Sequence, residues 1–497
     1  MATITDDKLH AEDAHDTAMD VAKGSVHVHT EYDEYLDLRR EFTGQRLQKL
    51  VRKVDWHVLP QLIIIYLMSY VDRTNVGNAK LFGAIPDMGM TGQDWNTALS
   101  VFFVTYAAGD LVTGTLGNRV LGLDILIDAK QQSWVDSISL LGFFEAGIFP
   151  GCSFILTYWY SPAEIHSRMT IFYCGASAAG AFSGLLAYGI GHLDYTWGYR
   201  GWRFIYCIEG LFSLLLAIVG FWVLNDTPAK VTKWLTPEEK KFLILRNRYA
   251  AGGETGIAEK EEFSWKAAKD AFTSFHIYAV ALMEFTLCVT VYGYSFILPT
   301  IISNLGYTAA NAQAMTAPPY IFACIVTVFS GWAADRYKQR MLSVVLPNSL
   351  AACGFIIMMV TSRYPHLPGV TLLGVFLTTA GLYPISPAVT AWIALNCAGS
   401  MKRAVGIGAM ISFSQLGGIV GSNIYIAGQS PTYPVGFGIS LGMLVVFGII
   451  WPIIYYFMLK GINKKRAAIP IEEVQAKYSE QQLSEMGDRS PLFRYST

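Results

Sequence analysis

Hydrophobic residues along this chain fall into long runs separated by short polar segments. Runs of about 20 apolar residues have the length of a membrane-spanning helix. In the first half, such runs lie near residues 58–78, 96–116, 137–158, 169–191 and 203–224. In the second half, they lie near residues 276–298, 315–334, 341–361, 369–392, 403–427 and 435–459. The pattern predicts an all-α polytopic membrane protein with eleven spans.

The composition agrees with this fold class. Hydrophobic residues make up 53% of the chain and charged residues only 15%, against roughly 25% charged residues in an average soluble domain. All seven cysteines lie in or beside apolar runs and lack the spacing of metal ligands, so neither a disulfide framework nor a zinc site is predicted. We expect no metal, no cofactor and no nucleic-acid partner.

Lysine and arginine gather before the first span, between the halves and after the last span, and the positive-inside rule places all three segments in the cytosol. The N-terminus lacks a basic region followed by an apolar stretch, so no cleaved signal peptide is predicted. The predicted segments are a disordered cytosolic N-tail (1–45), an N-terminal transmembrane half (46–224), a cytosolic linker (225–275), a C-terminal transmembrane half (276–460) and a cytosolic C-tail (461–497). Within the linker, "TPEEKKFLILRNRY" has the apolar spacing of a short surface helix.

An internal repeat shows where the first half is incomplete. Five spans there would put the basic linker outside, so charge and span count disagree. "GWAADRYKQR" (331–340) and "GTLGNRVLGL" (114–123) lie 217 residues apart, whereas later elements of the halves lie about 235 apart. The first half is thus short where a third span belongs, and residues 120–137 are too short and too charged to cross lipid. We predict a third helix that is truncated or missing near 118–136, from a skipped or misread exon.

Six short motifs occur in a characteristic order. They are "VDRTNVGNAK" (71–80), "FFEAGIFPG" (143–151), "GWRFIYCIEG" (201–210), "DTPAKVTKWLTPEE" (226–239), "YGYSFILPTII" (292–302) and "GGIVGSNIY" (417–425). With them, residues 45–460 resemble the major facilitator superfamily, and more narrowly its fungal anion:cation symporter family of allantoate-, nicotinate- and pantothenate-type permeases. The resemblance implies two six-helix halves around a substrate site near the bilayer midplane.

The same resemblance implies a function. We expect proton symport of a small organic anion, such as a vitamin or an allantoate-like carboxylate, imported by alternating access. The protein is expected to be a monomer in the lipid bilayer of the plasma membrane, with both termini cytosolic.

Asp72 and Arg73 stand out because they follow an apolar run directly. A charge in hydrocarbon is costly, so Asp72 should face a wet cavity, pair, or be protonated; alternatively it is a helix-end carboxylate that reaches the headgroups. The donor fork of Arg73 suits the capture of a carboxylate substrate. Its alternative is snorkelling to the interface.

Glu145 lies in mid-span beside glycines that allow helices to approach closely. The resemblance implies that Asp72 and Glu145 are the proton-coupling residues. The family pattern R-x-x-x-G-x-x-E carries an arginine seven residues before the glutamate, where this chain has Ile138. Loss of that cation is expected to weaken coupling.

Other polar residues within the spans are candidates to line the cavity and bind substrate. They are Asn75, Tyr292, Tyr294, Tyr383, Gln415 and Asn423. Aromatic residues in membrane helices more often serve packing, which is the alternative for the tyrosines. Asp110 and Glu209 fit packing or ion-pair roles between helices, and Glu284 is a further candidate proton site.

The repeated loop motif predicts a gate. Asp335 and Arg336, with Arg340, resemble the cytosolic ion-pair latch of the superfamily; simple topology charge is the alternative. In the first-half copy, Arg119 is kept but Asn118 replaces the acid. The latch is expected to be weaker on that side.

The sequence also bears on functions outside transport. The chain has no H-x-x-x-H, HExxH or G-x-x-x-x-G-K-[ST] motif, so an enzyme is not expected. A non-transporting nutrient sensor, or an inactive mis-spliced product on the same scaffold, stays open because Ile138 replaces the expected arginine.

Overall fold

The described part of the computed structural model is helical and contains no strand. That part comprises residues 31–116, 138–143, 145–224, 227–231, 233–249, 269, 272–337, 339–364, 366–397, 400–470, 473–474, 477–478 and 487–497. Nine helices within it are long and apolar enough to cross a membrane. The predicted defect near 118–136 lies outside the described residues.

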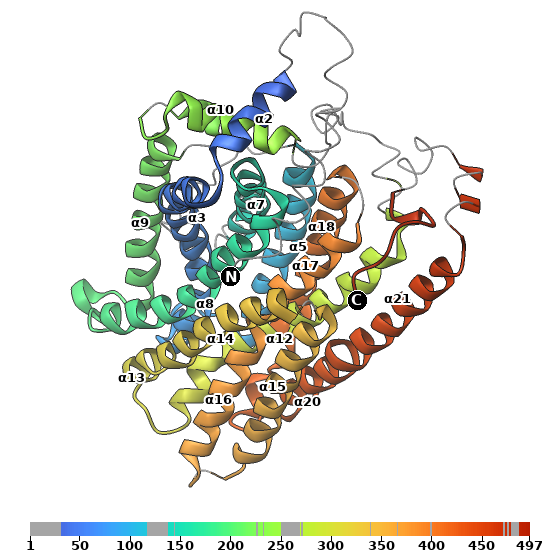
Figure 1. Ribbon diagram of the computed structural model, residues 1–497. Coiled ribbons are helices and arrows are strands. Elements are labelled where there is room, and N and C mark those ends of the chain that lie inside the picture. Colours follow the sequence, from blue (N-terminus) through green and yellow to red (C-terminus); the bar gives the residue numbers. More distant parts are fainter. Residues whose placement is uncertain are drawn as a thin grey trace, which may run out of the picture.

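In the first half, residues 138–143 are helical, and seven further helices have bounds within the described residues. They are α2 (Glu31–Glu41), α3 (Gly44–Leu81), α4 (Ala84–Asp87), α5 (Gly92–Leu116), α7 (Ile148–Trp159), α8 (Pro162–Gly191) and α9 (Gly201–Val223). The helix predicted in the linker follows as α10 (Pro237–Tyr249), which confirms that prediction. Helices α8 and α9 pack against α3, and the three form one side of the molecule (Figure 1).

The second half contains the six apolar helices of spanning length that were predicted there, over residues 275–467. Its elements are α12 (Phe275–Ser303), α13 (Ala309–Ala314), α14 (Ala317–Tyr337), α15 (Arg340–Thr361), α16 (Pro368–Leu382), α17 (Ile385–Asn396), α18 (Ser400–Gln415), α19 (Gly417–Ile424), α20 (Pro434–Met443), a π-helical turn η6 (Leu444–Ile450) and α21 (Trp451–Ala467). Local hydrophobicity alone sufficed to place these spans.

The two halves pack side by side (Figure 1) through three sets of helices. α3 contacts α12, α5 contacts α18 and α19, and α8 contacts α13 and α14. Small residues let the helices approach closely. A Cβ at Gly180 would lie 2.7 Å from the Tyr320 ring, and a Cβ at Gly331 would lie 2.6 Å from Thr170. The halves therefore touch toward both ends of the α8–α14 pair.

Part of the predicted disordered N-tail is ordered. α2 packs on α10 at one end of the molecule (Figure 1). Tyr35 stacks on Tyr249 with ring centroids 5.4 Å apart, and Phe42 stacks on Phe242 at 4.6 Å. Tyr35 and Phe42 are both buried. Burial of these aromatic rings explains why residues 31–41 form a helix despite their polar sequence.

Ion pairs join α10 to the first half. Lys53 pairs with Glu239 at 2.7 Å, and Arg246 of α10 pairs with Glu164 at 2.9 Å. Burial raises the pKa of Glu164, but hydrogen bonds and charge from Arg246, with a hydrogen bond from Ser161, outweigh it and leave that pKa below its ordinary value. The pair thus stabilises the fold at pH values above the ordinary pKa.

Glu164→Gln is therefore expected to lower the melting temperature at neutral pH, through the loss of up to about 1 kcal/mol of stability. The pKa of Glu164 is lower in the folded protein than its ordinary value of 4.5. The stability advantage of the wild type should therefore be lost as the pH falls below 4.5 and then through the lowered pKa. Melting curves of both proteins in detergent across this pH range measure the effect. Glu238→Gln, at an exposed pair with Arg46, is the control. A difference that does not change with pH would contradict the assignment.

The end of the predicted C-tail packs on the second half. Asp488 is buried and pairs with Lys402 at 2.6 Å. The amide of Ser496 donates to Asn396 Oδ1 at 2.7 Å, and the Trp392 indole donates to the Ser496 carbonyl at 3.0 Å. Residues 487–497, called the C-terminal segment below, are thereby attached to α17 and α18.

Asp488→Ala is expected to destabilise the second half by about 3–5 kcal/mol, because it leaves the Lys402 ammonium buried without its partner. The melting temperature in detergent measures the loss. Asp37→Ala removes a carboxylate from an exposed pair with Arg40 and should change little. Equal melting temperatures for the Asp488 and Asp37 variants would show that the buried pair does not hold the segment.

Candidate functional site

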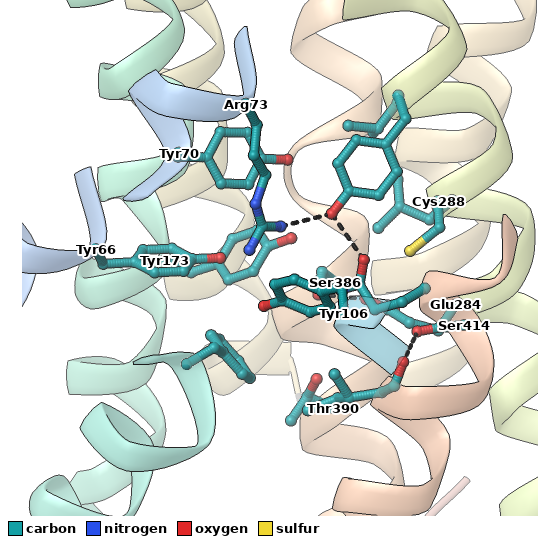
Figure 2. A pocket seen from close by; sticks show the side chains of 16 residues that line it. Tyr66, Tyr70, Arg73, Tyr106, Tyr173, Glu284, Cys288, Ser386, Thr390 and Ser414 are labelled. Carbon is teal, nitrogen blue, oxygen red and sulfur yellow. Dashed lines mark hydrogen bonds between the residues drawn. The ribbon is translucent and has the colours of Figure 1, made fainter. Parts of the chain in front are cut away.

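A cavity lies between the two halves and contains about 510 Å³ of empty space, part of it open to solvent. α3, α5, α7 and α8 of the first half line it together with α12, α17 and α18 of the second half. Its walls carry many tyrosines together with Arg73, Glu284 and Gln415 (Figure 2). Both halves thus contribute polar groups to one internal space.

Arg73 is the cation of this cavity, with only 5% of the residue exposed. Its Nε donates to Glu145 Oε1 at 2.5 Å and its Nη1 donates to the Tyr292 hydroxyl at 2.8 Å (Figure 2 shows the second bond). The guanidinium carbon lies 4.4 Å from the centroid of the Tyr106 ring. An ion pair, a hydrogen bond and an aromatic face therefore hold the charge at the cavity wall.

Glu145 is the ion-pair partner of Arg73. It is 3% exposed, and Oε1 accepts hydrogen bonds from both Ser69 and Arg73. Ile138, at the position of the expected arginine, is buried and apolar. The cation that Glu145 requires comes instead from Arg73, 72 residues earlier on α3. Sequence reasoning missed this pair, because no local pattern links the two positions.

Asp72 lies apart from the cavity wall. It is half-buried, it is absent from the cavity lining, and it interacts electrostatically with Tyr206 of α9. Asn75, also predicted to bind substrate, donates to Glu209 of α9 and accepts from Ser183 at 3.1 Å. Successive helix residues point about 100° apart, so Asp72 and Arg73 face different neighbours.

Two predicted substrate-binding residues of the second half lie in the cavity. The Tyr292 hydroxyl accepts from Arg73 and donates to Gln415 Oε1 at 2.9 Å (Figure 2). A continuous hydrogen-bond chain therefore runs from Ser69 through Glu145, Arg73 and Tyr292 to Gln415. It connects α3 of the first half with α12 and α18 of the second.

The remaining three residues predicted to bind substrate lie outside the cavity wall. The Tyr294 hydroxyl donates to the carbonyl of Val375 at 3.1 Å, and Tyr383 packs edge-on against Tyr320. Asn423 donates to Ser100 Oγ at 2.9 Å and so joins α19 to α5. These contacts support packing between helices.

The structure adds lining residues that sequence reasoning did not select. Tyr66, Tyr70, Tyr106, Tyr173, Ser386, Thr390 and Ser414 all reach the cavity. Serine, threonine and tyrosine are common in these helices, so nothing in the sequence distinguishes the ones that face inward. Among the described residues, no cluster of three or more His, Cys, Asp or Glu side chains could hold a metal ion.

The predicted gate is described only in part. Arg336 is exposed, and the backbone N–H of Arg340 donates to the carbonyl of Thr497 at 3.3 Å. The side chain of Asp335 and all of Arg119 lie outside the described residues. The ion-pair latch stays a prediction.

Comparison with known proteins identifies the fold that surrounds this cavity. The family model of the major facilitator superfamily matches residues 134–422 and 280–469. The chain belongs to this superfamily. It is accordingly a multi-pass membrane transporter, of a family whose members are not enzymes.

Individual relatives agree with this assignment. The chain is 39% identical over 491 residues to the MFS-type transporter cnsO of Penicillium expansum, with 94% of each chain covered. It is 29% identical to the high-affinity nicotinic acid transporter of Saccharomyces cerevisiae, over 90% of this chain and 84% of that one. A bacterial homologue of the human lysosomal transporter Spinster shares the fold, with a TM-score of 0.53 at 15% identity, covering 87% of this chain and 89% of the other.

Within this transporter, the cavity between the halves is the candidate site of transport. Its distinctive chemistry is a buried arginine whose ion-pair partner is a carboxylate that can take up a proton.

Proposed function

We propose that this transporter imports a small organic anion by proton symport and alternating access. The observation that carries the proposal is the buried pair between Arg73 and Glu145, with Arg73 at the cavity wall. The similarity to a nicotinic acid transporter supports a carboxylate, such as a vitamin or an allantoate-like metabolite, as the substrate.

Competition between Glu145 and the substrate carboxylate for Arg73 would couple proton binding to anion binding. In the substrate-free state Glu145 neutralises the guanidinium. Protonation of Glu145 removes this negative charge, and a buried arginine without an anion is costly. A substrate carboxylate then takes the place of Glu145. Proton and anion bind together for this reason, and release of the anion on the other side of the membrane lets Glu145 lose its proton and pair again.

The other predicted residues have supporting parts in the proposal. Tyr292 and Gln415 hydrogen-bond the substrate from the second half, and Asp72 forms a second proton site beside α9, where Asn75 donates to Glu209. The latch of Asp335, Arg336, Arg340 and Arg119 closes the cytosolic side. The remaining three predicted binding residues, Tyr294, Tyr383 and Asn423, shape the cavity from behind its wall. We propose a monomer in the plasma membrane with both termini cytosolic.

Uptake into proteoliposomes tests the proposal. The purified protein is reconstituted, an acidic outside is imposed, and accumulation of radiolabelled nicotinate, pantothenate and allantoate is followed. We expect accumulation of at least one of them above its outside concentration, and its loss on adding a protonophore. Binding without accumulation would instead indicate a nutrient sensor. Accumulation that the protonophore leaves intact would rule out proton symport.

A further inference from the structure

A carboxylate of the second half, Glu284 of α12, reaches the cavity that Arg73 lines from the first half (Figure 2). Glu284 is 5% exposed, and its Oε1 accepts a hydrogen bond from Ser386 of α17 at 2.5 Å. Its Oε2 is buried and has no hydrogen-bond partner. The proposed proton symport uses Glu145 and Arg73 and assigns no role to this group.

Glu284 and Arg73 lie in one cavity without being paired. The ion pair of Arg73 is with Glu145. Within the described part of the chain, no lysine, arginine or histidine forms an ion pair with Glu284. A buried carboxyl oxygen that lacks a partner is costly, and more so for a charged group. The Glu284 Oε2 atom is therefore available for a donor that enters the cavity.

We propose that Glu284 determines specificity by binding a nitrogen of the substrate, so that the transported molecule is a carboxylate that also bears an amine, an N–H group or a basic ring nitrogen. This inference rests on the proposed function, in which Arg73 takes the carboxylate. An N–H group donates to the ionised Glu284, and a basic ring nitrogen shares a proton with it. Either arrangement gives the Glu284 Oε2 atom a hydrogen-bond partner.

The same geometry disfavours carboxylates that lack such a nitrogen. A molecule of equal shape with C–H in place of nitrogen would bury Oε2 against an apolar group. Sites that are built to hydrogen-bond a substrate group reject analogues without it, because the polar group of the protein is left unpaired. A hydrogen bond to a charged group corresponds to about a 10- to 100-fold difference in affinity.

Matched ligand pairs test the inference. Dissociation constants are measured by calorimetry on the purified full chain for nicotinate against benzoate, β-alanine against butyrate, and allantoate against succinate. We expect the wild type to bind at least one nitrogen-bearing member about 10- to 100-fold more tightly than its partner. Glu284→Gln should weaken the nitrogen-bearing member and leave its partner unchanged, bringing the ratio close to one. Glu164→Gln, which alters a carboxylate outside the cavity, should keep the wild-type ratio.

Several outcomes would overturn the inference. They are equal affinities of the wild type within every pair, tighter binding of the nitrogen-free members, no binding of any probe, or equal weakening of both members by Glu284→Gln. The wild-type ratios decide the substrate class even if the variant fails to fold. Proton-driven accumulation of benzoate or butyrate would overturn this inference while leaving the proposed anion import intact, so the two proposals fail separately.

Discussion

Arg73→Ala is expected to abolish accumulation of the substrate and to weaken its binding by about 100-fold or more, because the variant loses the buried cation that pairs with the anion. The variant keeps the Glu145 carboxylate beside the position of the lost guanidinium and so repels a substrate carboxylate. Equilibrium binding and proteoliposome uptake measure the two effects. An unaltered affinity would remove Arg73 from the substrate site.

Two further variants separate this effect from folding. Arg73→Lys keeps the charge but loses the planar donor fork, so binding should fall less than in the alanine variant. Arg73→Ala combined with Glu145→Gln removes both members of the buried pair and should recover melting temperature without recovering binding. Arg203→Ala, at a partly exposed pair with Asp87, is the control for losing an arginine.

Glu145→Gln is expected to abolish proton-driven accumulation while substrate binding persists. Glutamine keeps the size of the side chain and mimics the protonated acid, so Arg73 stays available to the anion, but no proton is carried. Exchange of labelled for unlabelled substrate should therefore continue without a pH gradient, and binding should lose its pH dependence. Uptake, exchange and binding on one preparation measure these three properties.

Asp72→Asn provides the matched comparison on a carboxylate that lies near α9, whereas Glu145 pairs with Arg73. If Asp72 is the second proton site that we propose, this variant also loses accumulation. If Glu145→Gln still accumulates substrate and Asp72→Asn does not, Asp72 alone carries the proton and competition for Arg73 is not the coupling step.

Much of the scaffold could be predicted from local sequence. The six spans over residues 275–467 and helix α10 occur where hydrophobic spacing placed them. A run of apolar residues must leave water whatever its neighbours are, and a helix is the structure that satisfies its backbone in lipid. α2 escaped prediction because its polar sequence becomes helical only through burial of Tyr35 and Phe42 against α10.

The candidate site could be predicted only in part. Arg73 was identifiable because a cation beside an apolar run is costly unless it has a function. Its pairing with Glu145 was not, because Ile138 occupied the expected position of the cation and the actual one lies on another helix. The resemblance suggested equal roles for Asp72 and Glu145, yet Glu145 contacts Arg73 whereas Asp72 lies near α9.

The sequence by itself determined that this chain is a helical membrane protein of the major facilitator superfamily, and which charged residues lie among its apolar runs. Only the tertiary structure decided which of them meet: that Arg73 pairs with Glu145, and that Glu284, which has an unpartnered oxygen, lines the same cavity as Arg73. The physical reason is the separation along the chain of the residues on which each property depends. Partition into lipid depends on about 20 consecutive residues, whereas an ion pair depends on the packing and rotation of helices far apart in the chain.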